Sequence, residues 1–430
     1  MEEKFDKNSH LTRWEPGNEY MRRNYALGRT IKDSGIKDPD GSYTNTFFMH
    51  GFGQLSFLTD GCRLGQCCFC TYGALNHDLS PQIVEREMDA FINNVKNNPH
   101  TIYSVLFDAV GSILDSKEFP PECLDVVLKK AEELLKEVPT IEELSFETHY
   151  QTLGYYDKDG KYVTSEALNK IIAFKEAHPE VKDYVIELGL ESANNELRDQ
   201  LLLKHINDKT FARAIYALHE HGIKVDANIM ATVPFLTKKE QIEESVNSII
   251  TALTPYEEGG YGVDKVVLFP LNVRENTFCD YVFKSADAYA EKHPEWQKPS
   301  WLDNTFSIWS MVATLKVLAD QRPDLLDKVS VAAWFGGDRI LSDSDVQPDD
   351  WQTAYDLLVA YRAAMSPEEK IAIINQLAST PAYQEYIQSK VMNEPEEKLS
   401  YTERAMFINK LTKEVNLPVR SKCSKANQSN

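Results

Sequence analysis

The feature that most constrains the fold is an alternation of short β-like runs with longer helical stretches between Gly53 and Asn276. This rhythm is typical of βα units arranged around a parallel sheet. Helical stretches such as Cys123 to Val138 and Lys209 to His221 separate the runs, and Gly222 is placed to end the second stretch. Six strands are predicted, over Gln54 to Leu58, Tyr103 to Phe107, Glu143 to Glu147, Tyr184 to Leu190, Val225 to Met230 and Lys265 to Leu271.

Within these runs, apolar and polar side chains alternate. From Ile186 to Glu191, isoleucine and leucine alternate with glutamate and glycine, and Glu147 and Asp226 lie on the polar sides of their runs. If the apolar faces pack under helices, the polar faces look into a lumen, which a closed eight-stranded barrel normally fills with aliphatic residues. A polar lumen therefore predicts an α/β fold of the partial (β/α)6 TIM-like barrel type, open on one side and able to hold a polar ligand. The alternative places these carboxylates at an exposed sheet edge.

The 430 residues divide into three predicted regions: an N-terminal extension over 1–50, the partial barrel over 51–300 and a helix-rich C-terminal region over 301–430. The last region contains helical stretches at Asp303 to Asp320, Asp350 to Ala364, Pro367 to Leu377 and Tyr401 to Glu414. Residues 331–337, VAAWFGG, read either as an additional strand and turn that brings Trp334 to the barrel mouth or as part of the helix packing.

Composition narrows the class of protein. Hydrophobic residues make up 42% of the chain and the mean hydropathy is -0.41, as in soluble globular proteins. The net charge of -20 argues against nucleic acid as the first partner, because phosphate backbones are bound by cationic patches. The N-terminal residues lack an apolar signal core, and no run of about 18 apolar residues occurs, so we expect a cytoplasmic protein without membrane spans.

Four of the seven cysteines fall within nine residues, which indicates a metal site in a reducing compartment rather than a disulfide framework. In DGCRLGQCCFCTYG, Cys62, Cys67 and Cys70 follow the first predicted strand, at the rim where barrels place their sites. Three thiolates would leave one iron of a 4Fe-4S cube free to bind a substrate or cofactor. The alternative is a structural zinc ion, with His77 or Cys68 as the fourth ligand. The remaining cysteines, Cys123, Cys279 and Cys423, receive no role.

The cysteine loop resembles that of the radical S-adenosylmethionine (SAM) superfamily, C-x3-C-x-aromatic-C. The stretch from Cys67 to Cys70 matches the second half of this pattern, with Phe69 as the aromatic residue and Cys68 at the variable position. The first gap is one residue longer than usual. Four further segments resemble the branch containing the Elongator catalytic subunit and the archaeal enzymes that complete archaeosine: FDAVGSILDSKEFP (107–120), IELGLESANNELRD (186–199), VPFLTKKE (233–240) and LNVRENTF (271–278).

This resemblance implies a set of cofactor contacts. Gly111 would let the backbone approach the methionine amino group, Glu191 would bind the ribose or amino acid part of SAM, and Lys204 would neutralise its carboxylate. The full set is Phe69, Tyr72, Gly111, Ser112, Glu191, Ser192, Lys204 and Val233. The plainer alternatives are an ordinary turn at Gly111, a helix N-cap at Ser192, a solvated lysine and a loop residue at Val233.

The substrate contacts predicted from the polar faces and the rim are Glu147, His149, Glu187 and Asn272. Buried carboxylates need cationic or hydroxyl-bearing partners, which favours a small polar substrate that carries an amine. By resemblance, a reduced 4Fe-4S cluster would cleave SAM and usually yield a 5′-deoxyadenosyl radical, with flavodoxin or ferredoxin as the reductant. Cleavage that releases a 3-amino-3-carboxypropyl group stays open. The alternatives are an archaeosine-type tRNA-modifying enzyme and a non-catalytic zinc-stabilised binding protein.

Overall fold

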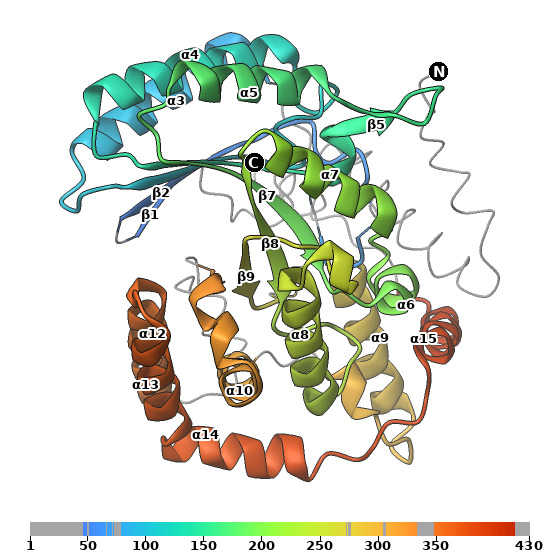
Figure 1. Cartoon of the computed structure of the whole chain (residues 1–430). Coiled ribbons are helices and arrows are strands. Elements are labelled where there is room, and N and C mark those ends of the chain that lie inside the picture. The colour runs from blue at the N-terminus through green and yellow to red at the C-terminus, as the bar shows by residue number, and fades with distance from the viewer. Residues whose placement is uncertain are drawn as a thin grey trace, which may run out of the picture.

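A computed structural model describes residues 46–49, 51–65, 67–70, 72, 79–271, 273, 277–303, 307–332 and 348–417. Its main sheet has the strand order β1-β2-β3-β4-β7-β8-β9-β10, in which the antiparallel β1 is followed by seven parallel strands (Figure 1). The strands are β1 Thr46–Met49, β2 Phe52–Phe57, β3 Ser104–Ala109, β4 Glu143–Thr148, β7 Asp183–Glu191, β8 Lys224–Met230, β9 Lys265–Phe269 and β10 Val329–Val331. A separate hairpin joins β5 Gly154–Tyr156 and β6 Tyr162–Thr164.

Helices connect the parallel strands and cover the outer face of the sheet, with α3, α4 and α5 forming one layer (Figure 1). Polar caps mark where several begin: Ser80 caps α3, and Thr237 forms a capping box with Glu240 at the start of α8. The helices are α3 Pro81–Lys96, α4 Pro121–Glu137, α5 Glu166–Ala177, α6 Asn195–Leu197, α7 Asp208–Glu220, α8 Lys238–Leu253, α9 Phe278–Lys292, α10 Ile308–Gln321, α12 Pro348–Ala363, α13 Pro367–Ala378, α14 Pro381–Tyr386 and α15 Tyr401–Val415. Shorter helical turns are η2 Tyr150–Thr152, η3 Arg198–Leu202, η4 Tyr256–Glu258, η5 Ser300–Leu302, η6 Pro323–Lys328 and η7 Ile387–Met392.

The partial TIM-like barrel predicted from the sequence is confirmed, and so is the assignment of its two faces. Phe107, Phe146 and Ile186 are fully buried in the large hydrophobic cluster between the sheet and the outer helices. Glu147 and Glu187 alternate with these residues and therefore lie on the inner face. Because β4 and β7 each have a neighbour on both sides, the alternative of an exposed sheet edge for these carboxylates is wrong.

All six predicted strands are present, and β10 adds a seventh parallel strand next to β9. This strand coincides with the start of the VAAWFGG stretch, although Trp334 lies outside the described residues. β1, by contrast, falls in the region predicted to be an N-terminal extension and pairs with β2. The division of the chain into three regions stays a prediction.

Helix α12 reaches from β10 towards the opposite edge of the sheet. The Arg362 guanidinium donates to the Val331 carbonyl oxygen at 2.9 Å, and its Cζ lies 5.1 Å from the centre of the Phe52 ring on β2. Burial lowers the pKa of Arg362, while Glu187, Glu143 and Asp226 oppose this change, so the guanidinium lies near inner-face carboxylates. One arginine thus contacts both β10, at one edge of the sheet, and β2, the second strand from the other edge.

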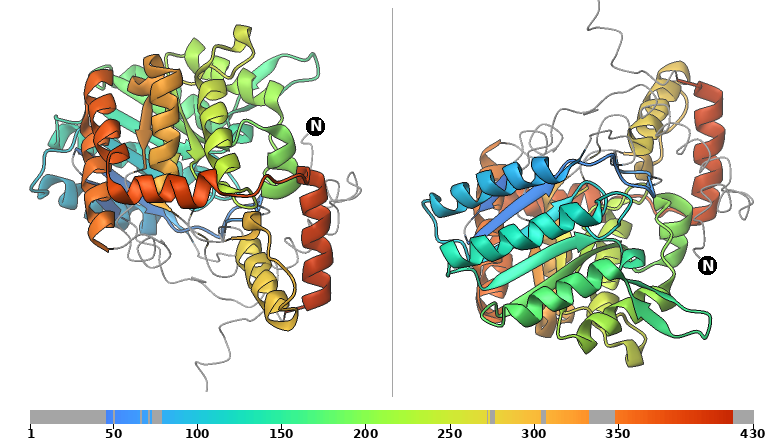
Figure 2. Two further views of the ribbon diagram at one scale, coloured as in Figure 1. Left: turned by 90° about the horizontal axis from the view of Figure 1, so that it is seen from below. Right: turned by 90° about the horizontal axis from the view of Figure 1, so that it is seen from above.

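A second hydrophobic cluster packs α9 and α15 against the loops beyond the C-terminal ends of the strands. The two helices lie side by side (Figure 2). Arg404 of α15 is buried and forms two hydrogen bonds with the Glu240 carboxylate, at 2.9 and 2.6 Å. The C-terminal helix is therefore fixed to the rim of the barrel. Among the described residues, none of the helices combines the length and the apolar character needed to cross a bilayer.

Candidate functional site

The cysteine loop begins after β2 and folds back on itself at the rim. The backbone N–H of Cys62 donates to the Tyr72 carbonyl oxygen at 2.9 Å, and that of Cys70 donates to the Cys67 carbonyl oxygen at 3.2 Å. The Tyr72 N–H in turn donates to the Cys70 sulfur at 3.3 Å. These bonds bring the first and the last cysteine of the loop together.

The three thiols affect one another's ionisation, which requires that they lie close together. Burial raises the pKa of Cys62 well above its usual value, and Glu118, Cys70 and Cys67 raise it further. Burial also raises the pKa of Cys67, with Lys204 opposing and Cys70 adding to the increase. Without a bound cation, these half-buried thiols stay protonated, whereas a metal centre would displace the protons and stabilise the thiolates.

Cys68 points away from this group. Its sulfur lies 3.4 Å from the sulfur of Cys279 on α9, and both residues are fully buried. The Cys68 backbone donates to the Leu202 carbonyl oxygen at 3.0 Å and accepts from the Cys279 N–H at 2.9 Å. Cys68 therefore anchors the loop to its surroundings, and Cys279, which received no role from the sequence, is its partner.

The loop between β3 and α4 clamps the cysteine loop from the other side. The Arg63 N–H donates to the Glu118 carboxylate, and the Arg63 guanidinium forms an ion pair with Asp115 at 2.6 Å. Gly111 has a φ of +124°, and a Cβ there would stand 3.2 Å from the Cα of Cys62 and collide with Glu118. Glycine is thus required both by the backbone conformation and by the close approach of the two loops.

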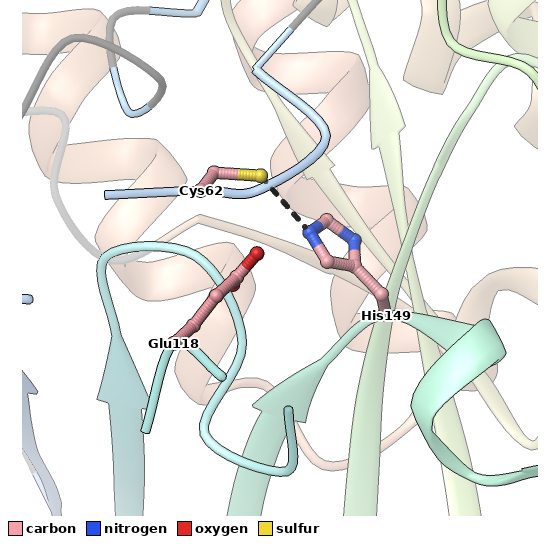
Figure 3. Close-up of side chains that lie close together, drawn as sticks. All are labelled: Cys62, Glu118 and His149. Atoms are coloured by element: carbon pink, nitrogen blue, oxygen red, sulfur yellow. Dashed lines mark hydrogen bonds between the residues drawn. The ribbon is translucent and has the colours of Figure 1, made fainter. Parts of the chain in front are cut away.

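His149, predicted from the sequence as a substrate contact, lies against the first cysteine. Its Nε2 is 3.4 Å from the Cys62 sulfur, and the Glu118 carboxylate points towards both residues (Figure 3). The ligand atoms of these three residues lie within 4.8 Å of one another, close enough to hold a metal ion. Burial, together with Lys204 and Arg63, lowers the pKa of His149 to about 3.

Ser112 joins the loops that follow β3 and β4. Its fully buried hydroxyl is hydrogen-bonded to the Thr148 hydroxyl and accepts from the His149 backbone N–H at 3.3 Å. The side chain therefore fixes the backbone at His149. Its predicted contact with SAM stays a prediction.

Glu191 and Lys204 form a buried ion pair of 2.6 Å at the end of β7. The Lys204 ammonium lies over Gly189, where a Cβ would be only 2.4 Å from its Nζ. Glu191 has a φ of +67°, in the left-handed region that a non-glycine residue rarely adopts, and its Oε2 is buried without a hydrogen bond among the described residues. Such strain and an unsatisfied oxygen are typical of functional sites.

Two of the predicted SAM contacts have partners within the fold. The Ser192 hydroxyl donates to the buried Glu244 carboxylate at 2.6 Å and accepts from the Asn194 N–H at 3.0 Å. Val233 is fully buried, and its carbonyl oxygen accepts from the Gln241 side chain at 3.0 Å. Cofactor contacts at either position stay predictions.

Four carboxylates form a row across the inner face: Asp108, Glu147, Glu187 and Asp226, here called the acidic row. The register pairs Glu147 with Glu187 and Glu187 with Asp226, while Asp108 stands opposite Ser56. Within the described part of the chain, neither Glu147 nor Glu187 has a hydrogen bond or an ion pair to its carboxylate. Burial raises the pKa of both residues well above the usual range, and the neighbouring carboxylates add to this.

Comparison with known proteins identifies relatives of this chain in sequence. No family model matches the chain. Archaeosine synthase subunit beta from Methanosarcina acetivorans is 22% identical over 304 residues, which cover 69% of this chain and 76% of that protein. The Thermococcus kodakarensis protein of the same name is 25% identical over 300 residues, covering 67% and 79%.

These relatives confirm the resemblance seen in the motifs. The resemblance of the chain to the radical SAM superfamily therefore has the support of sequence relatives as well as of motifs. A solved structure of Elp3 from the archaeon Methanocaldococcus infernus aligns with a TM-score of 0.39 and 16% identity, over 66% of this chain and 57% of that one.

The residues of the cysteine loop fit an iron-sulfur centre. Cys62, Cys67 and Cys70 supply three soft donors in one group, while Cys68 is engaged with Cys279 outside it. Phe69 is partly buried against the second hydrophobic cluster. Asn272 and His77 lie outside the described residues, so the predicted role of each is untested.

Sequence reasoning missed the groups that hold the site from outside the cysteine loop. Asp115 and Glu118 were included in the segment 107–120 but received no role, although both bind Arg63. The acidic side chains inside that segment were the available signal. Nothing in the sequence near Cys279 or Arg362 indicated their contacts.

Proposed function

We propose that this protein is a radical SAM enzyme that acts on a small, polar, amine-bearing substrate. The proposal is supported by two features of the same half-barrel. Three grouped thiols lie at the rim, and the acidic row lies on the inner face. The first feature suits an iron-sulfur centre, and the second suits a cation.

Cys62, Cys67 and Cys70 would hold the 4Fe-4S cluster, which when reduced supplies the electron that cleaves SAM into a carbon radical. Lys204 would turn its ammonium from Glu191 towards the SAM carboxylate, and the buried Oε2 of Glu191 would accept from a ribose hydroxyl. Gly111 leaves room for the cofactor next to Cys62. Phe69, Tyr72, Ser112, Ser192 and Val233 complete the proposed cofactor contacts.

Glu147 and Glu187 would bind the substrate. A carboxylate on the inner face without a basic partner is costly, and an ammonium group would relieve this cost by providing both charge and hydrogen bonds. Lys265 approaches Asp226 only to 3.9 Å, and Arg362 lies near Glu187 and Asp226, so the row has more carboxyl groups than basic partners. His149 and Asn272 were also predicted as substrate contacts, and both assignments remain proposals.

The decisive experiment is anaerobic reconstitution with iron and sulfide, followed by chemical reduction, incubation with SAM and mass spectrometry of the products. We expect a brown protein that bleaches with dithionite and yields SAM fragments, whose identity reports which carbon-sulfur bond breaks. Flavodoxin or ferredoxin should replace dithionite as the electron donor. A colourless protein that leaves SAM intact would contradict the proposal.

A matched pair of variants tests the ligand set. Cys67→Ala should lose the cluster, whereas Cys68→Ala should retain it, because the Cys68 sulfur faces Cys279. The reverse result would shift the ligand set by one residue. Iron and zinc analysis of the same samples tests the alternative of a zinc-stabilised binding protein, for which Cys62, Glu118 and His149 offer a donor set.

The substrate site is tested with Glu147→Gln and Glu187→Gln. Each variant should bind the amine-bearing substrate at least about tenfold more weakly, a loss of about 1.4 kcal/mol, while SAM binding is unchanged. Unchanged substrate affinity in both variants would exclude the acidic row as the site.

The second candidate function is modification of tRNA, which the names of the two relatives favour. The net charge of -20 opposes it, because binding to a phosphate backbone depends on cationic groups. Salt-sensitive retention of tRNA on a filter, at concentrations where a duplex DNA control is not retained, would make tRNA the better substrate.

A further inference from the structure

The His149 ring contacts the sulfur of a proposed cluster ligand, and the fold fixes it there. His149 follows β4 directly, its backbone N–H donates to the Ser112 hydroxyl, and its carbonyl oxygen accepts from the Thr152 hydroxyl at 2.7 Å. With the backbone held on both sides, the ring reaches across to Cys62, and its Nε2 lies 3.4 Å from the sulfur (Figure 3).

This contact belongs to a set of N–H groups directed at the cysteine sulfurs. The Tyr72 backbone N–H donates to the Cys70 sulfur at 3.3 Å. Within the described residues, His149 is the one side chain in hydrogen-bonding distance of the Cys62 sulfur. A neutral imidazole carries a single N–H, and the tautomer with its proton on Nε2 would direct that proton at the sulfur.

We propose that His149 is a positioning residue that donates a hydrogen bond to the Cys62 sulfur and so makes the bound cluster easier to reduce. This inference rests on the proposed function, because it requires a cluster on Cys62. One-electron reduction adds negative charge to the iron and sulfur atoms, and a hydrogen-bond donor at the sulfur stabilises that charge. The electron comes from a low-potential one-electron donor, and no proton needs to leave the imidazole.

The test is a redox titration of the reconstituted protein, without SAM, followed by electron paramagnetic resonance (EPR). His149→Phe keeps a ring of similar shape but removes the donor, and His149→Gln keeps an N–H of similar reach. At a fixed potential, His149→Phe should lower the ratio of reduced to oxidised cluster on the order of tenfold, which for a one-electron couple equals a midpoint about 59 mV more negative. His149→Gln should restore most of the wild-type value.

The matched control is His221→Phe, which replaces an exposed histidine at the end of α7, away from the cysteine loop. Its midpoint potential should equal that of the wild type. A His149→Phe midpoint equal to the control, with an unchanged EPR spectrum, would overturn the inference.

If His149→Phe does not assemble a cluster, a measurement on the wild-type protein tests the inference instead. Protein labelled with 15N in histidine alone should show a nitrogen coupling to the reduced cluster in pulsed EPR, and His149→Gln should lose it. A cluster that forms without this coupling overturns the role of His149, whereas failure of the wild-type protein to assemble any cluster overturns the proposed function itself.

Discussion

The two faces of the half-barrel sheet are built from neighbouring residues but have opposite chemistry. On the outer face, Phe107 and Phe146 pack ring against ring, with centroids 5.8 Å apart, under the helices. On the inner face, the adjacent Asp108 and Glu147 belong to the acidic row. The outer face contributes stability by removing apolar surface from water, whereas the inner face loses stability by partly burying carboxyl groups that have few basic partners.

This contrast separates folding from function within single strands. A residue that helps the fold and a residue that weakens it stand one position apart, and only the alternation of a β-strand allows both. The proposed substrate site would use the inner face of the same strands whose outer face stabilises the fold.

The largest expected effect is on the outer face. Phe146→Ala should lower the free energy of unfolding by about 3–5 kcal/mol, because it leaves a cavity in a fully buried aromatic cluster. Urea unfolding monitored by circular dichroism measures this loss. The matched variant Glu147→Gln, one residue along, should cause no loss, and equal destabilisation by both would remove the distinction between the faces.

The second-largest expected effect is a dependence of folding stability on pH, which arises from the carboxyl groups of the inner face. Burial raises the pKa of Asp108 to about 7, with Glu187 adding to the rise and hydrogen bonds from Ser56 and Gln54 opposing it. The unfolded chain releases this proton near its ordinary value of about 4, so between these values the folded state binds more protons. Stability is therefore greatest at the acidic end of this window and falls as the pH rises, on the order of 4 kcal/mol by pH 8.

This dependence is measured by urea unfolding at a series of pH values in wild type and Asp108→Asn. The variant should show a shallower decline, with the remainder coming from the other members of the row, such as Asp226, whose pKa burial raises to about 6. If the free energy of unfolding falls equally with pH in the two proteins, the Asp108 carboxylate is solvated in the folded state and its pKa is not raised.

A smaller effect, an increase in stability, is expected when one carboxylate of the acidic row is replaced by an amide. Glu187→Gln should raise the free energy of unfolding at pH 8 by about 1–2 kcal/mol, since it removes a partly buried charge that has no ion pair. Glu176→Gln, an exposed glutamate on α5, is the control and should change nothing. If Glu187→Gln destabilises the protein instead, the carboxylate is bonded within the fold.

The smallest effect is at the beginning of the same strands, where charges meet water. Lys224 and Asp183 form an ion pair of 2.6 Å at the starts of β8 and β7, and the Lys224 side chain is 51% exposed. Lys224→Ala should cost less than about 1 kcal/mol, and the cost should disappear near 1 M salt. A larger loss of stability that does not depend on salt would contradict the comparison, because it would mean that charges at the starts of these strands affect stability as strongly as the buried carboxyl groups of the acidic row.

The strands and their faces could be predicted because both follow from a period of two in the sequence. The grouping of Cys62, Cys67 and Cys70 could also be predicted, because all three lie on one short loop and are therefore close together in space. Two predicted helices begin where α13 and α15 begin, at Pro367 and Tyr401, and Ser366 and Ser400 are their N-caps. The helix predicted from Asp303 begins only at Ile308.

Contacts between distant segments could not be predicted. Cys68 and Cys279 meet through tertiary packing, and neither has a pattern around it that refers to the other. The same holds for Glu118 with Arg63 and for Arg362 with Phe52. His149 was singled out by its place on a polar face, yet its contact with Cys62 depends on how the rim loops fold over one another.

The position of α12 has a practical consequence for anyone who shortens this protein. A fragment that ends at residue 300 lacks both β10 and Arg362, so β9 becomes an unprotected edge and the underside of the acidic row is open to solvent. Such a fragment retains every cysteine of the loop but is expected to aggregate, and fragments used to study the iron-sulfur chemistry should retain α12.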